Sequence, residues 1–157
     1  MSLLKDALPM QHVGYLVKDR DACVAHLEKL YGITGWKMVE YKPMATKCYG
    51  KPFENYYVKA AVHPSIDGCG IELIQPVSGG LHYDFKERDH DSINHICHKP
   101  ADYEYWINRF VEKGCELVFE AEMEDDVLGY RRCGYVYDPV LRTVFEFAEI
   151  PHFRNKK

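Results

Sequence analysis

"HVGYLVKDRDACVAHLEKLYG", residues 12–32, is a strand-like run followed by a helix-like run that ends at a glycine. Apolar side chains at positions 13, 15 and 17 alternate as in a strand, with His12 at its start on the other face. Apolar residues between Ala22 and Leu30 then recur at helical spacing, and Gly32 suits the left-handed residue that ends a helix. The stretch therefore predicts a β–α unit with a histidine at the beginning of its strand.

The same order of elements returns in NHICHKPADYEYWINRFVEKG, residues 94–114. His95 again begins a strand-like run, and residues 100–114 again carry an apolar stripe at helical spacing that ends at Gly114. Histidine and glycine are 20 positions apart in the first unit (12 to 32) and 19 in the second (95 to 114). A repeated unit of this kind indicates an internal duplication, so we expect two similar modules.

Three strand-like runs follow each helix. They span 36–42, 55–62 and 71–76 in the first half, and 115–121, 131–138 and 143–149 in the second. The acidic run EAEMEDD (120–126) is more typical of a solvated loop than of a calcium site, because it lacks the EF-hand pattern. We therefore predict an α+β fold in a single domain over 1–157, with βαβββ modules at 11–76 and 93–149 and a linker at 77–92. Neither module can bury a sheet face alone, so the two should pack together.

The composition argues against several function classes. Hydrophobic residues make up 46% of the chain, charged residues 28%, and the net charge is −4, so no broad basic surface favours binding to nucleic acid or a membrane. No apolar run approaches the roughly 18 residues that cross a bilayer. The opening MSLLKDALPM lacks the apolar core of a signal peptide, and the six cysteines are scattered without a Cys-x-x-Cys pair. Reduced thiols in a cytoplasmic protein fit this pattern best.

A glutamate stands inside the last predicted strand of each half. Glu72 lies in GIELIQP and Glu146 in TVFEFAE, each between apolar neighbours. Strand alternation puts each carboxylate on the face opposite to those neighbours, and an ionised carboxylate there needs water, a partner or a metal. If a pseudo-twofold axis relates the modules, both glutamates meet His12 and His95 at one centre. Two imidazoles and two carboxylates suit a divalent first-row metal.

Each of these residues also has an ordinary explanation when it is taken alone. A histidine at the start of a strand is most often a hydrogen-bonded structural residue, and a glutamate in a strand most often faces solvent. The repeated order favours the metal site instead, because each half supplies one histidine on its first strand and one glutamate on its last.

These stretches, together with YVYDPVLRTVFEFAE (135–149), resemble the vicinal oxygen chelate superfamily. The superfamily includes glyoxalase I, methylmalonyl-CoA epimerase, bleomycin-resistance proteins and extradiol dioxygenases, and the resemblance covers residues 11–149. It implies a curved mixed sheet around a central metal cavity, the glyoxalase/bleomycin-resistance/dioxygenase fold. It also implies a homodimer with one divalent ion per site, for which Co, Ni, Zn, Mn and Mg are all suitable.

Glu72 favours the glyoxalase–epimerase branch, because the resemblance implies no metal ligand at this position in extradiol dioxygenases. The implied activity is proton transfer next to a carbonyl through a metal-stabilised enolate, catalysed by a lyase or an isomerase. The implied substrate is a thioester or thiol adduct, either an acyl-CoA such as methylmalonyl-CoA or a glutathione hemithioacetal. Glu146 would act as ligand and base in turn, and Glu54 in KPFENYY resembles the second acid/base of the epimerases.

Two other functions stay open at this point. An Fe(II) ring-cleaving dioxygenase would use His12, His95 and Glu146 as a facial triad. A non-catalytic protein of the resistance type would hold a small planar ligand in the same cavity. Oxygen consumption with catechols identifies the first, and a metal-free protein that retains a ligand identifies the second.

Overall fold

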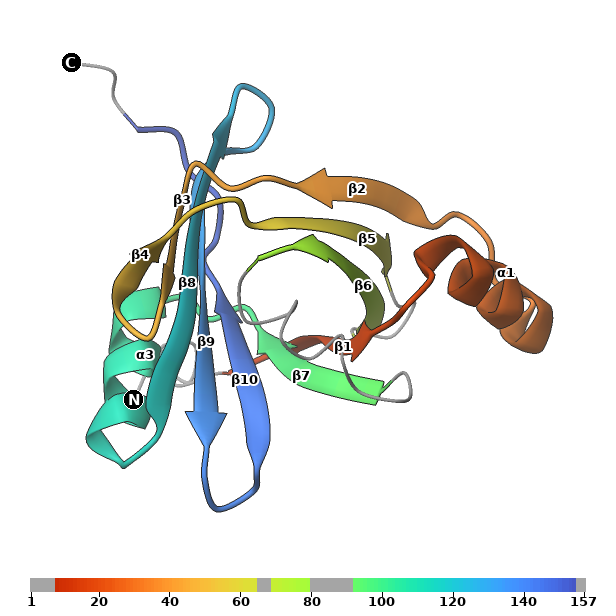
Figure 1. The fold of residues 1–157 in the computed structure, drawn as a ribbon. Helices are drawn as coiled ribbons and strands as arrows, with labels where there is room; N and C mark the ends of the chain where they lie inside the picture. Colours follow the sequence, from red (N-terminus) through yellow and green to blue (C-terminus); the bar gives the residue numbers. More distant parts are fainter. Residues whose placement is uncertain (1–7, 65–68, 80–91, 155–157) are drawn as a thin grey trace.

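The computed structural model describes residues 8–64, 69–79 and 92–154, which form one strongly curled sheet with two helices (Figure 1). The first half contains β1 (Met10–Leu16), α1 (Arg20–Tyr31), β2 (Lys37–Tyr41), β3 (Ala45–Cys48), β4 (Lys51–Phe53), β5 (Tyr57–His63) and β6 (Gly70–Ser78). The second half contains β7 (Ser92–His98), α3 (Tyr103–Glu112), β8 (Glu116–Asp125), β9 (Gly129–Asp138) and β10 (Thr143–Ala148). Most of the predicted linker, residues 80–91, lies outside the described residues.

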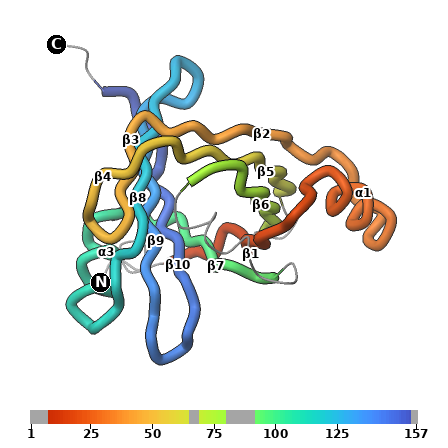
Figure 2. Tube along the Cα trace, viewed as in Figure 1, coloured from red at the N-terminus to blue at the C-terminus, as the bar shows by residue number. Residues whose placement is uncertain are grey.

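The sheet is mixed, and its strand order is β2-β5-β6-β1-β7-β10-β9-β8-β3-β4. β1 and β7, the first strands of the two halves, pair antiparallel near its middle. On their other sides β1 pairs in parallel with β6, and β7 pairs in parallel with β10. The first and last strands of both halves therefore lie side by side, in the pseudo-twofold arrangement that the repeat predicts (Figure 2).

Both helices begin where an aspartate satisfies their first backbone N–H groups. The Asp19 carboxylate accepts a hydrogen bond from Ala22 N at 2.9 Å, and Gly32 ends α1 with a φ of 66°. Asp102 caps α3 in the same way, so this helix begins at Tyr103, whereas the predicted helical segment begins at residue 100. The N-terminus of each helix is therefore set by a capping aspartate, Asp19 for α1 and Asp102 for α3.

The helices cover the outer, convex face of the sheet (Figure 1). α3 buries Tyr103 and Ile107 against Phe147, and α1 packs the half-buried Leu27 against Leu73. The concave face carries no helix among the described residues, so its side chains are free to line a cavity. No helix in the described part of the chain is both long enough and apolar enough to cross a bilayer.

A short hairpin inside the first half is the main difference from the predicted elements. β3 and β4 pair with each other, and β3 adds to β8 of the second half. β8 itself continues to Asp125, so the acidic run 120–126 is mostly strand and the prediction of a loop there is wrong. The acidic residues alternate with Ala121 and Met123, which line the inside of the curl. The predicted α+β fold, a curved mixed sheet around a cavity, is otherwise confirmed.

Candidate metal centre

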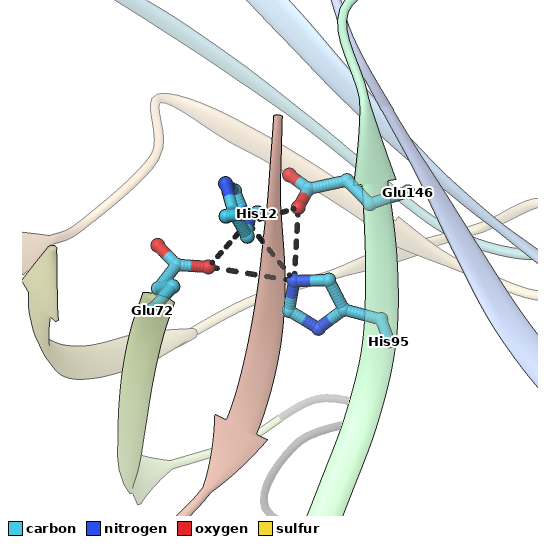
Figure 3. A group of neighbouring side chains, drawn as sticks. All are labelled: His12, Glu72, His95 and Glu146. Atoms are coloured by element: carbon cyan, nitrogen blue, oxygen red, sulfur yellow. Dashed lines mark hydrogen bonds and ion pairs between the residues drawn. The ribbon is translucent and has the colours of Figure 1, made fainter. Parts of the chain in front are cut away.

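Four side chains point to one centre on the concave face, two from each half of the chain (Figure 3). His12 comes from β1, Glu72 from β6, His95 from β7 and Glu146 from β10. One ligand atom of each residue lies within 4.8 Å of the other three. The predicted convergence of these residues is therefore confirmed.

The register of the four central strands explains why these side chains meet. Gly14 of β1 lies opposite Glu72 on one side and opposite His95 on the other. His12 precedes Gly14 by two residues and so lies on the same face. Glu146 pairs with Cys97, two positions after His95, and so lies on the face of His95. The apolar neighbours of both glutamates pack toward the helices instead, as strand alternation predicts.

Gly14 makes room for the imidazole of His95. A Cβ atom at this position would lie 2.5 Å from Nδ1 of His95 and closer still to Cε1 and Nε2. Non-bonded carbon atoms approach to about 3.5–4.0 Å, so the ring can lie across the β1 backbone only because residue 14 has no side chain. Nothing in the sequence pattern distinguishes Gly14 from a glycine that merely weakens a strand.

The distances between the ligand atoms match the edges of a coordination polyhedron. His12 Nε2 lies 3.1 Å from Glu72 Oε2 and 3.3 Å from Glu146 Oε2. His95 Nε2 lies 3.4 Å and 3.1 Å from the same two oxygens, and the two Nε2 atoms are 3.3 Å apart. Metal–ligand bonds of about 2.1 Å give edges of about 3.0 Å in an octahedron and about 3.4 Å in a tetrahedron. A divalent first-row ion therefore fits this donor set.

The charges of the centre also fit a divalent ion. All four side chains are buried. Burial alone would lower the pKa of His12, but the adjacent carboxylates of Glu146 and Glu72 raise it to about 10. Burial likewise opposes ionisation of Glu146, yet the two imidazoles hold the pKa of this carboxyl group well below its usual value. Two ionised carboxylates thus need two positive charges, which a divalent cation supplies while leaving both imidazoles neutral.

Two details favour a cation over two protons at this centre. Glu146 Oε2 is buried and has no aligned hydrogen-bond donor among the described residues. The His12 and His95 Nε2 atoms are only 3.3 Å apart, so N–H groups on both would point at each other. Nδ1 of His95 lies 3.1 Å from Oδ1 of Asn94, which suits the tautomer that keeps Nε2 free for a metal.

The centre opens onto a cavity of about 370 Å³ on the concave face, a size typical of small-molecule sites. His12, Glu72 and Glu146 line this cavity. Its other walls are mainly aliphatic and aromatic, and include Val39, Tyr41, Tyr56, Val58, Ile74, Phe119 and Tyr135. Cations line it as well, namely Lys37, Lys99, Arg131 and Arg132. A small molecule with an apolar body can therefore reach three of the four ligands.

Glu54, the second predicted acid/base, lies away from this centre. It is exposed in the turn between β4 and β5 and lines a separate surface cavity. Asn55 follows with a φ of 63°, and after it Tyr56 lines the metal cavity. The structure therefore brings the four predicted ligands together but does not bring Glu54 to them.

The sequence matches the family described as "Glyoxalase/Bleomycin resistance protein/Dioxygenase superfamily" over residues 11–133. The chain therefore belongs to this superfamily, as the resemblance of its motifs predicts. None of the curated proteins matches it.

Several solved structures share the fold at low sequence identity. Methylmalonyl-CoA epimerase from Mycobacterium tuberculosis is 16% identical with a TM-score of 0.62, over 97% of this chain and 92% of that chain. The hypothetical protein BH1468 from Bacillus halodurans C-125 is 18% identical with a TM-score of 0.61, over 96% and 100%. A variant of Streptomyces coelicolor methylmalonyl-CoA epimerase in complex with 2-nitronate-propionyl-CoA is 15% identical with a TM-score of 0.58, over 91% and 98%. At these identities the comparison shows a common fold.

Proposed function

We propose that this protein is a metal-dependent enzyme that moves a proton at the carbon next to a carbonyl group, as an isomerase or a lyase. The observation that carries this proposal is the buried set of two imidazoles and two carboxylates at the wall of a small-molecule cavity. A ring-cleaving dioxygenase needs only two histidines and one carboxylate. Glu72 supplies a second carboxylate, which favours proton transfer over oxygen chemistry.

His12, Glu72, His95 and Glu146 would hold the metal. A bound divalent ion would act as a Lewis acid that polarises the substrate carbonyl and stabilises negative charge on its oxygen. His95 would serve only as a ligand, because it is fully buried behind the cavity wall. The other three ligands line the cavity and can contact substrate.

Glu146 is the residue placed to take the proton. Its carboxyl group lines the cavity within reach of a bound substrate, and it would serve as metal ligand and as base in turn. A carboxylate can accept a proton from a substrate carbon and deliver it to the adjacent carbon, which isomerises the substrate, whereas inversion at the same carbon would need a second acid on the opposite face. The apolar walls around it exclude water, which protects the carbanionic character that develops.

The substrate class that we propose is an acyl-CoA or a glutathione hemithioacetal. Support for the first comes from the fold, which is shared with methylmalonyl-CoA epimerases and with an epimerase complex that holds a CoA derivative. The cations that line the cavity suit either substrate, because both carry negative charge away from the reacting carbonyl.

Proton exchange in deuterated water tests this proposal. We expect the metal-loaded protein to exchange the proton next to the carbonyl of methylmalonyl-CoA or of the methylglyoxal–glutathione adduct at least about a hundredfold faster than the chelator-treated protein, as followed by NMR. Metal-loaded protein that exchanges neither compound but consumes oxygen with catechols would contradict the proposal and assign a dioxygenase. Protein that holds a small planar ligand without any metal would assign a binding protein.

A further inference from the structure

Two lysines, Lys37 and Lys99, line the metal cavity without an ion-pair partner in the described part of the chain. The other cations of the cavity are already neutralised, since Arg131 and Arg132 form ion pairs of 2.7 Å and 2.9 Å with neighbouring carboxylates. A divalent ion would balance the two glutamates of the centre. The cavity therefore keeps two positive charges, although the whole chain has a net charge of −4.

The strand register places Lys37 in one row with a metal ligand. Lys37 of β2 pairs with Val62 of β5, and Val62 pairs with Glu72 of β6. Neighbouring strands are about 4.8 Å apart, so the Cα atoms of Lys37 and Glu72 are about 10 Å apart on the same face. The flexible four-carbon stem of lysine can carry its ammonium group across much of that distance.

Lys99 lies at the same end of the sheet, on the other side of the centre. It directly follows β7, and its backbone N donates a hydrogen bond to Pro9 O at 3.2 Å, next to the start of β1. His12 is the third residue of β1, and Glu72 is the third residue of β6. The two lysines thus flank the end of the cavity at which the metal ligands stand.

We infer that Lys37 and Lys99 form an anion-binding pair that attracts anionic groups from the two sides of the metal centre, and that the substrate carries at least one negatively charged group apart from its reacting carbonyl. This inference rests on the proposed function, because it takes the metal centre as the place where the carbonyl binds. Ammonium groups form charge-assisted hydrogen bonds with carboxylates and phosphates alike. The bound group is therefore either a carboxylate of the acyl part or a phosphate of its carrier.

Binding of three probes to the metal-loaded protein distinguishes these two sources. Methylmalonyl-CoA carries a carboxylate and phosphates, the methylmalonyl thioester of N-acetylcysteamine carries only the carboxylate, and propionyl-CoA carries only phosphates. Lys37→Gln and Lys99→Gln should each raise the Kd of methylmalonyl-CoA about tenfold in isothermal titration calorimetry. The corresponding arginine variants should stay within about threefold of the wild type.

The pattern over the other two probes identifies the group. Weaker binding of the N-acetylcysteamine thioester assigns the carboxylate, and weaker binding of propionyl-CoA assigns a phosphate. Lys59→Gln is the matched control, because strand alternation on β5 puts Lys59 on the face opposite to the cavity-lining Val58. This control should leave every Kd unchanged, and all variants should keep the wild-type metal content.

Two results would overturn the anion-binding pair. One is an unchanged Kd for methylmalonyl-CoA in both glutamine variants, and the other is failure of all three probes to bind the metal-loaded wild type. The readout does not require turnover. Lysine-dependent binding without any proton exchange would support the pair while contradicting the proposed reaction.

Discussion

Glu146→Gln is expected to lower the rate of proton exchange by about a thousandfold or more and to weaken metal binding at the same time. The amide cannot take a proton and brings no negative charge to a centre in which Glu146 Oε2 lies 3.1 Å from His95 Nε2. The amide has nearly the same shape as the carboxyl group, so the packing around it is kept, and the Tm of the variant checks that it is folded. Exchange by NMR and metal titration of the same preparation measure the two effects.

Glu116→Gln is the control for this variant, because Glu116 is an exposed residue at the start of β8. It should exchange protons and bind metal as the wild type does. Near-wild-type exchange by Glu146→Gln would remove the role of Glu146 as base. If Glu146→Gln loses proton exchange but keeps its metal affinity, Glu146 is the base but not a metal ligand.

Gly14→Ala should weaken metal binding about a hundredfold or more. The new Cβ atom would lie 2.5 Å from Nδ1 of His95 and nearer to two other ring atoms, so the imidazole must leave its place by an ångström or more. Misplacement of a catalytic group by about 1 Å costs about a hundredfold in rate, and loss of a partner that orients a metal ligand already costs about 10–100-fold in metal affinity. Titration of the metal-free protein with Co²⁺ or Zn²⁺ measures the loss.

Gly134→Ala separates this effect from general destabilisation. A Cβ atom at Gly134 would lie 2.7 Å from the Tyr103 hydroxyl oxygen and 2.8 Å from Cδ1 of Ile107, on the α3 side of the sheet. This variant should lower the Tm but keep the wild-type metal affinity. Wild-type metal affinity in Gly14→Ala would show that the His95 ring does not need the space above Gly14.

The four candidate metal ligands could be picked out from the sequence because each depends on a local pattern. Strand alternation fixes the face of Glu72 and Glu146, and the duplicated order of elements pairs His12 with His95. Their convergence also assumes that a pseudo-twofold axis relates the two modules, and the observed pairings of β1 with β7, of β1 with β6 and of β7 with β10 agree with that assumption.

The residues that sequence reasoning missed all depend on long-range pairing. Gly14 acquires its role only because His95 lies opposite it on another strand. Lys37 shares a row with Glu72 only through the register of three strands. For Glu54 the local sequence was misleading in the opposite way. It resembles the second acid/base of the epimerases, but it lies exposed beside the turn at Asn55, away from the four clustered side chains.

The missed hairpin has a similar cause. β3 and β4 are only four and three residues long, and the segment contains Lys47, Lys51 and Pro52, so its sequence shows no strand-like run. Its strand character comes from pairing with β8, which lies some 70 positions further along the chain. The acidic run at 120–126 is mostly strand because residues 120–125 pair with β9 in a hairpin, and residues 120–122 also pair with β3.

The claim that two histidines and two glutamates, one of each per module, bind a single divalent ion is tested most directly by anomalous diffraction from crystals of the Co²⁺-loaded protein. We predict one strong peak per chain on the concave face, about 2.0–2.2 Å from Nε2 of His12 and His95 and from one carboxylate oxygen of Glu72 and Glu146. A fully loaded crystal with its peak elsewhere, or with these four side chains turned away from the ion, would contradict the account.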